Sequence, residues 1–162
     1  MKGMLQVDIL LGGNVGNTLE IFSKAKEQLI EKAGAIMRES SLYRTEAWGF
    51  DSDPFLNQVV TLKTKLLPHE LLETLLSVEA FFGRERIGEG YAARTLDLDI
   101  LFVEEQIINI PDLVVPHPRM GERRFVLEPL SELYPDRVHP VTRKTISWML
   151  AECDDTSSVE KL

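Results

Sequence analysis

Two carboxylates stand two residues apart in an otherwise apolar stretch of this chain. Residues 94–102 read Arg-Thr-Leu-Asp-Leu-Asp-Ile-Leu-Phe, so Asp97 and Asp99 alternate with apolar side chains. Because successive side chains of a strand point to opposite faces, both carboxylates are expected on one face, about 7 Å apart at their Cα atoms. Two negative charges on one face require either covering water or a cation between them. Magnesium, a hard ion that prefers oxygen ligands and phosphate-bearing substrates, is the natural candidate.

Arginines gather around this strand in the sequence. No lysine occurs between Lys65 and Lys144, and a cluster of arginines falls within that interval: Arg84, Arg86, Arg94, Arg119, Arg123 and Arg124. The planar fork of a guanidinium matches the oxygens of a phosphate. Any single arginine is better explained as a surface residue paired with a neighbouring glutamate. The cluster beside paired aspartates, however, favours phosphate binding.

Other chemistry has weaker support. His117 stands between Pro116 and Pro118, which stiffen its backbone on both sides, and it precedes the second group of arginines. Considered alone, it would be a loop histidine hydrogen-bonded to backbone. One cysteine and three scattered histidines do not provide the ligand spacing of a zinc site. The glycine-rich turn at residues 11–18 lacks the Gly-Lys-Ser/Thr ending of a phosphate-binding P-loop.

The bulk composition limits the classes of function. The 162 residues suit a single domain over 1–162, with a frayed polar tail after about residue 153. A net charge of −8 opposes non-specific binding of nucleic acid. No apolar run is long enough to span a bilayer and no hydrophobic signal segment is found, so no membrane partner is expected. The lone cysteine, Cys153, cannot form an internal disulfide, which favours a cytoplasmic location.

Hydrophobic periodicity predicts the secondary structure that must position these residues. Strands are expected at residues 6–11, 35–44, 55–66 and 96–103, with a returning strand at 107–110. Helices are expected at 18–33, 68–82, 122–133 and 145–152. The order is β-α-β-β-α-β followed by a C-terminal extension. It is typical of the ferredoxin-like α+β fold, an antiparallel sheet with helices packed on it.

Glu79 interrupts the apolar face of the helix expected at 68–82. It lies four residues from Leu75 and three from Phe82, which both belong to that face. A carboxylate in such a stripe is costly unless it is paired or hydrogen-bonded. The spacing leaves open whether Glu79 is satisfied in this way or lies at the edge of the face and reaches solvent.

Further segments complete a recognisable pattern with residues 94–102. They are Leu42-Tyr43-Arg44-Thr45, Pro54-Phe55-Leu56-Asn57, Gly83-Arg84-Glu85-Arg86 and Val115-Pro116-His117-Pro118-Arg119-Met120. In order and spacing they resemble the 6-hydroxymethyl-7,8-dihydropterin pyrophosphokinase family, over roughly residues 5–150. Departures from the family pattern are Glu46, Leu76 and Tyr91, and none of them is a metal ligand or an arginine of the pattern.

The resemblance implies a definite reaction in folate biosynthesis. ATP donates its β,γ-pyrophosphoryl group to the 6-hydroxymethyl oxygen of the dihydropterin, and AMP leaves. Two magnesium ions would be held by Asp97 and Asp99, and the catalytic set would be Arg84, Arg94 and Asp97. ATP would contact Glu79, Arg84, Arg86, Arg94, Ile100, His117 and Arg123. The pterin would contact Trp48, Phe55, Asn57 and Phe125, and Thr45 through its backbone.

Two other functions remain as alternatives. One is a different Asp-x-Asp magnesium enzyme acting on nucleotides, such as a nucleotidyl or glycosyl transferase. The other is a non-catalytic ferredoxin-like binding module. On the pyrophosphokinase interpretation the partners are the small molecules ATP and hydroxymethyl dihydropterin. A monomer is expected, with a dimer as the alternative.

Overall fold

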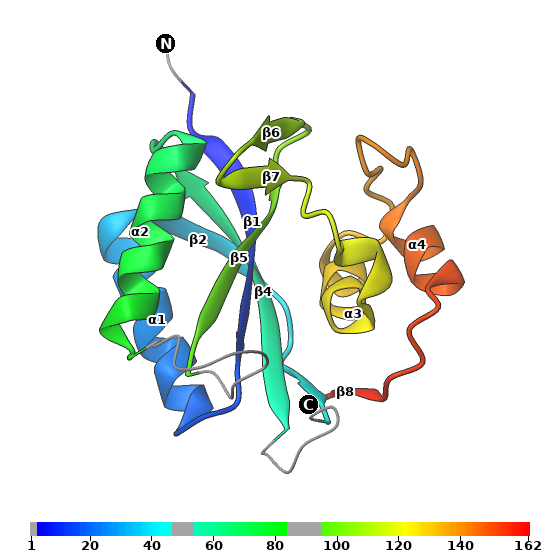
Figure 1. Ribbon diagram of the computed structural model, residues 1–162, viewed down its shortest axis with the longest axis horizontal. Coiled ribbons are helices and arrows are strands. Elements are labelled where there is room, and N and C mark those ends of the chain that lie inside the picture. The colour runs from blue at the N-terminus through cyan, green and yellow to red at the C-terminus, as the bar shows by residue number, and fades with distance from the viewer. Residues whose placement is uncertain (1–2, 47–53, 84–94) are drawn as a thin grey trace.

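The computed structural model describes residues 3–46, 54–83 and 95–162, and Figure 1 shows their arrangement. Trp48, Arg84, Arg86, Tyr91 and Arg94 lie outside these described residues. The elements, in chain order, are β1 (Leu5–Gly13), α1 (Thr18–Lys32), β2 (Gly34–Glu39), β3 (Tyr43–Thr45), β4 (Phe55–Thr64), α2 (Pro68–Phe81), β5 (Asp97–Val103), β6 (Ile108–Ile110), β7 (Leu113–Val115), a 3-10 turn (Met120–Glu122), α3 (Arg124–Leu133), α4 (Ile146–Glu152) and β8 (Val159–Lys161).

The main sheet has the ferredoxin-like topology predicted from the order of elements. Its strands run in the order β5-β1-β4, with both β2 and β3 paired to β4 beyond. Every pairing is antiparallel. The crossover through α1 carries the chain from β1 to β2, and β4 fills the place between them. The expected α+β ferredoxin-like core is thereby confirmed.

Apolar side chains from both faces of the sheet form two cores, one on each side. On one face, β1 and β4 pack against α1 and α2 through residues that include Ile9, Leu11, Phe22, Leu62 and Leu75. On the opposite face lie α3 and α4 (Figure 1). That second core includes Leu10, Val59, Leu127, Leu130 and Met149. The C-terminal extension therefore forms a layer of its own, opposite the two helices of the ferredoxin-like core.

A buried polar network ties this C-terminal layer to the sheet. Asp8 on β1 is 0% exposed. Its carboxylate accepts a hydrogen bond from Thr61 Oγ1 at 2.7 Å and another from the guanidinium of Arg137. Arg137 also donates to the Glu104 carbonyl at 3.0 Å and stacks over the Phe102 ring, 4.2 Å from its centroid. The buried carboxylate is thus fully partnered, as a charge without water must be.

Two expectations about the strands are wrong. Residues 35–44 do not form one strand, because the chain turns away after Glu39 and re-pairs with β4 as β3. The tail after Cys153 is not frayed throughout, since β8 pairs with β3 in the register Thr45↔Val159 and Tyr43↔Lys161. A three-residue polar segment has no apolar pattern to reveal it. Strand pairing uses backbone groups, and the open edge of β3 provides them.

None of the helices among the described residues is both long enough and apolar enough to cross a membrane.

Candidate active site

The floor of the candidate site is a row of residues that lie side by side across three strands. Asp97 on β5 is opposite Gly12 on β1, and Gly12 is opposite Asn57 on β4. Directly opposed residues of antiparallel strands share a face of the sheet. Leu98 and Ile100 point the other way, into the core beneath α1 and α2. The predicted common face of Asp97 and Asp99 is therefore confirmed, and it is the face toward α3.

Gly12 keeps this floor open between the carboxylate and the amide. A Cβ atom built on Gly12 would stand 3.0 Å from Asn57 Oδ1 and 3.9 Å from the Leu56 carbonyl oxygen. No side chain therefore separates the Asp97 column from the Asn57 column. With neighbouring strands about 4.8 Å apart, the two Cα atoms are roughly 10 Å from each other. That span is wide enough for a flat ring beside a phosphate group.

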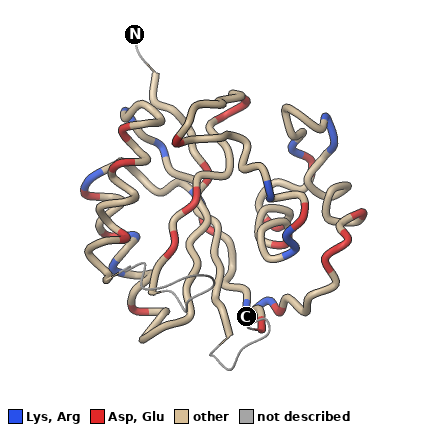
Figure 2. Tube along the Cα trace, in the orientation of Figure 1, with Lys and Arg blue, Asp and Glu red and all other residues tan. Residues whose placement is uncertain are grey.

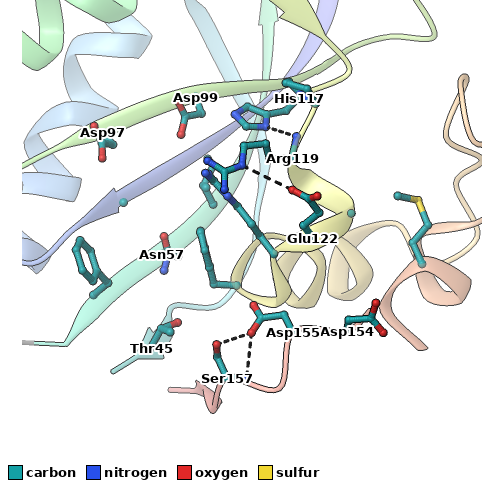
Figure 3. A pocket seen from close by; sticks show the side chains of 18 of the residues that line it. Thr45, Asn57, Asp97, Asp99, His117, Arg119, Glu122, Asp154, Asp155 and Ser157 are labelled. Atoms are coloured by element: carbon teal, nitrogen blue, oxygen red, sulfur yellow. Dashed lines mark hydrogen bonds and ion pairs between the residues drawn. The ribbon is translucent and has the colours of Figure 1, made fainter. Parts of the chain in front are cut away.

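A cavity of about 1600 Å³ opens over this floor. Figure 3 shows Asp97, Asp99 and Asn57 on its strand side and His117 and Arg119 where the chain approaches α3. Many of the residues singled out from the sequence line it: Thr45, Phe55, Asn57, Asp97, Asp99, His117, Arg123 and Phe125. The tertiary structure thus brings the predicted metal, nucleotide and pterin residues to one hollow.

Carboxylates and arginines both line this cavity. Acidic positions on β5 face the basic positions that precede and begin α3 (Figure 2). Arg119 pairs with Glu122 at 3.7 Å, and the Arg123 guanidinium lies over the Phe125 ring, 5.7 Å from its centroid. Guanidinium groups opposite carboxylates suit a ligand with several negative oxygens, which the arginines can contact directly and the carboxylates through a cation.

His117 is held by its backbone and by its ring. Its amide donates to the Leu101 carbonyl at 3.0 Å, and its Nδ1 accepts from the Arg119 amide at 3.2 Å. Burial lowers the pKa of His117, and Arg123 and Arg119 lower it further, whereas Asp99 opposes them. The neutral ring with Nδ1 as acceptor carries its proton on Nε2. The histidine therefore offers one N–H donor to a ligand.

Thr45 provides a polar group that sequence reasoning placed at the site only through its backbone. Thr45 is buried, and within the described ranges its Oγ1 is the buried side-chain oxygen or nitrogen without a hydrogen-bond partner. A buried hydroxyl without a partner costs about 1–3 kcal/mol. Thr45 lines the cavity, so a ligand that displaces the atoms covering Oγ1 could supply the missing partner. No feature of the sequence signals this, since it depends on what surrounds β3.

Two predicted ATP contacts, Glu79 and Ile100, are not among the residues that line the cavity. Glu79 does not reach solvent at the edge of its helix, because it is only 2% exposed. Its Oε2 accepts a hydrogen bond from the Leu98 amide at 2.7 Å, on the side of β5 away from β1. Ile100 is buried in the core. Their contacts with ATP stay predictions, as do those of the arginines outside the described residues.

The C-terminal segment contributes to the cavity, which the sequence did not indicate. Asp154, Asp155 and Ser157 line it together with Thr142 and Glu152. Figure 3 shows Asp155 and Ser157 across the cavity from Asp99. The sequence does not predict this contribution, because a polar tail has no periodicity that would place it against the sheet.

The carboxylates of β5 are suited to a cation that shares its ligands with the substrate. Within the described ranges, no group of three or more His, Cys, Asp or Glu side chains could hold a metal alone. Magnesium, which keeps several waters and binds through one or two carboxylates plus substrate phosphates, fits the Asp97 and Asp99 pair.

The fold and the cavity define a ferredoxin-like α+β protein whose cavity is lined by paired carboxylates, arginines and aromatic rings. Comparison with known proteins makes the assignment specific. The chain belongs to the 7,8-dihydro-6-hydroxymethylpterin-pyrophosphokinase family, whose model matches residues 8–135. The family resemblance expected from the sequence is confirmed.

Several relatives support this membership. The 2-amino-4-hydroxy-6-hydroxymethyldihydropteridine pyrophosphokinase of Synechocystis is 43% identical over 148 residues, which cover 91% of this chain and 75% of the relative. The enzyme of the same name from Aquifex aeolicus is 41% identical, covering 88% of this chain and 89% of the relative. The folate synthesis bifunctional protein of Arabidopsis thaliana is 43% identical over 79% of this chain, but the match spans only 27% of that protein.

A solved structure supports the fold. The Plasmodium falciparum HPPK-DHPS wild type with pteroate superposes with a TM-score of 0.74 at 16% identity. The superposition covers 94% of this chain and 43% of that one. At this identity the likeness supports the fold alone.

Proposed function

We infer that this chain transfers the β,γ-pyrophosphoryl group of ATP to the hydroxymethyl oxygen of 6-hydroxymethyl-7,8-dihydropterin, a step of folate biosynthesis. The hydroxyl oxygen attacks the β-phosphorus, the bond from that phosphorus to the α-phosphate oxygen breaks, and AMP leaves. The observation that carries this inference is the family match over residues 8–135, which includes the strands that form the floor of the cavity and the start of α3.

Asp97 and Asp99 are proposed as the ligands of two magnesium ions that accompany ATP. When bound, the ions neutralise phosphate charge and lower the pKa of the attacking hydroxyl. The protein holds the two carboxylates on one face of a strand that is itself fixed on both sides. β1 pairs with one edge of β5, and Glu79 accepts from the Leu98 amide on the other. The ligands are therefore positioned before the substrate arrives.

The proposed contacts to ATP come from both sides of the cavity. Arg123 and the Nε2–H of His117 would donate to phosphate or ribose oxygens from the α3 side. Arg84, Arg86 and Arg94 are proposed to contact the triphosphate, and Arg84 and Arg94 would stabilise the charge that develops in transfer. Glu79 and Ile100 are also proposed to lie near the nucleotide. Such transfer depends on positioning and charge neutralisation more than on covalent help from the protein.

The pterin is proposed to lie over the Asn57 column. Its ring would stack between Phe55 and Phe125, which line the same cavity from β4 and α3. Asn57 offers both an amide donor and an acceptor, and Thr45 offers the unpartnered hydroxyl. Trp48 is proposed to lie nearby. The partners of this chain are thus small molecules, and we propose a monomeric cytoplasmic enzyme, in keeping with its single cysteine.

One assay tests the proposal against the alternatives. Purified protein is given Mg²⁺ and ATP, with and without 6-hydroxymethyl-7,8-dihydropterin, and nucleotide products are separated. AMP should form only when the pterin is present. ADP or free pyrophosphate as the main product would refute the proposal and favour another transferase.

A matched pair of variants then tests the site. Asp97→Asn should abolish turnover and leave the unfolding midpoint close to that of the parent, since Asp97 acts through metal rather than packing. Asp112→Asn removes the same charge from the exposed turn between β6 and β7 and should leave turnover intact. Unfolding of Asp97→Asn would instead assign that residue a structural role.

A further inference from the structure

The helix that carries Phe125, with Arg123 just before it, begins without a side-chain cap of its own. α3 starts at Arg124, and its N-cap residue, Arg123, makes no side-chain capping hydrogen bond. No acidic residue occurs in the first turn. An arginine cannot accept a hydrogen bond, and two positive charges lie at the end of the helix where the dipole is also positive. By local sequence this is a poor place for a helix to begin.

A carboxylate from far along the chain supplies what is missing. Asp155 Oδ2 accepts a hydrogen bond from the Arg124 amide at 3.0 Å. Asp155 Oδ1 accepts from the Ser157 amide at 2.9 Å and from the Ser157 hydroxyl. The carboxylate thus places an acceptor and a negative charge at the start of α3, as an N-cap aspartate would.

The same C-terminal segment is fixed at its far end to the opposite wall of the cavity. Two residues after Ser157 the chain enters β8, whose Val159 is opposite Thr45 on β3. The Leu162 amide donates to the Leu42 carbonyl at 2.9 Å and extends the pairing. Residues 155–162 therefore join the start of α3, beside Phe125, to the strand that carries Thr45.

We propose that Asp155 is a positioning residue of the pterin side of the site, capping α3 and thereby setting Phe125 against the wall that carries Thr45. This inference rests on the proposed function for the identity of the ligand. Asp155 lines the cavity, but its proposed role requires no contact with substrate or metal. It acts through the backbone of Arg124, the residue next to Phe125.

The ionisation of Asp155 agrees with this role. Burial of Asp155 opposes its charged form. Hydrogen bonds from Ser157 and from the Arg124 amide, together with the charge of Arg124, outweigh this effect. The pKa of Asp155 therefore lies below its ordinary value. The group is therefore a carboxylate at neutral pH, with both oxygens available as acceptors.

Glu132 provides a matched control on the same helix. It lies at the other end of α3 and accepts hydrogen bonds from the Ser41 amide at 3.1 Å, the Ser41 hydroxyl at 3.0 Å and the Tyr43 hydroxyl at 2.7 Å. Glu132→Gln weakens the attachment of α3 to the sheet without touching its first turn. Glu132 is also absent from the residues that line the cavity.

The experiment compares Asp155→Ala, Asp155→Asn and Glu132→Gln with the parent. The probe is 6-hydroxymethyl-7,8-dihydropterin, titrated with Mg²⁺ and an ATP analogue whose α,β-bridging oxygen is replaced by methylene, so that AMP cannot leave. Asp155→Ala should raise the Kd of the pterin about three- to tenfold, the equivalent of a lost cap. Asp155→Asn keeps an acceptor oxygen and should stay within about threefold of the parent. Glu132→Gln should leave the Kd unchanged.

Amide hydrogen exchange without substrate tests the cap itself. Exchange at residues 124–127 should accelerate in Asp155→Ala and not in Glu132→Gln. The proposal is overturned if exchange accelerates while the Kd of the pterin does not change, or if Glu132→Gln raises that Kd as much as Asp155→Ala. Unchanged exchange in Asp155→Ala would overturn it as well. If the parent protein forms no AMP, the proposed function is refuted instead. The exchange measurement distinguishes this failure from a failure of the capping proposal, because it needs no ligand.

Discussion

Replacing Gly12 by alanine would place a methyl group on the floor of the site, beside the amide proposed to bind the pterin. The added carbon would stand 3.0 Å from Asn57 Oδ1, whereas a relaxed carbon–oxygen contact is about 3.3–3.6 Å. Gly12 is paired with a strand on each side, so its backbone cannot give way easily. The Asn57 side chain must therefore move by a few tenths of an ångström or turn.

The expected loss follows from the hydrogen bonds that Asn57 can make. Each neutral hydrogen bond contributes about 1 kcal/mol, and an amide facing the ring can make one or two. The Kd of the pterin should rise roughly five- to thirtyfold, given that 1.4 kcal/mol corresponds to about tenfold. Alanine is preferred to glycine in a strand by about 0.5–1 kcal/mol, which offsets the crowding, so the free energy of unfolding should change by less than about 1 kcal/mol.

Titration calorimetry with the pterin, and separately with the methylene analogue of ATP, measures the effect. The Kd of the nucleotide should not change, because among the described residues, apart from its chain neighbours, the atoms within 4 Å of the new carbon belong to Asn57 and Leu56. A double-mutant cycle with Asn57→Ala tests the cause, since the penalty of Gly12→Ala should vanish once the amide is absent. An equal penalty in both backgrounds, or a parallel loss of nucleotide affinity, would refute the reasoning.

Three further predictions follow from the same contacts. Thr45→Val removes the unpartnered buried hydroxyl. The protein should become about 1 kcal/mol more stable in urea unfolding, while its affinity for the pterin falls. A gain in both stability and affinity would contradict the proposed ligand contact. Gly34→Ala places a Cβ 2.0 Å from the Lys63 carbonyl oxygen on the neighbouring strand. Thermal unfolding should therefore show that the free energy of unfolding falls by several kcal/mol. An unchanged unfolding midpoint would show that β2 and β4 separate easily. Arg137→Met leaves Asp8 buried without its cation, which should lower the free energy of unfolding in denaturant by about 3–5 kcal/mol. A decrease of less than about 1 kcal/mol would mean that water reaches the carboxylate.

Local periodicity was sufficient to predict much of the fold. The alternation of residues 94–102 fixed the common face of Asp97 and Asp99, because side-chain direction on a strand depends only on the backbone. The spacing of Leu71, Leu75 and Val78 likewise determined which face of α2 is buried. The order of strands and helices then left the ferredoxin-like topology as the natural arrangement, and the motifs identified the family.

The candidate site required the tertiary structure. Gly12 lies between Asp97 and Asn57 only because β1 is paired between β5 and β4, and pairings between distant strands leave no local pattern. For the same reason, the spacing of apolar residues along α2 could not show that Glu79 would accept a hydrogen bond from the Leu98 amide of an edge strand.

The end of the chain gives the clearest contrast between what is local and what is tertiary. By its composition, the segment after Cys153 is polar and indicates a frayed tail. In the folded protein its backbone pairs with β3, and Asp155 caps a helix that begins 31 residues earlier. The sequence by itself determined the chemistry on offer: two carboxylates, a group of arginines and a pair of aromatic rings. Only the tertiary structure decided which groups meet in one cavity, because hydrogen bonds between distant segments depend on where the backbone passes and not on the pattern of side chains along it.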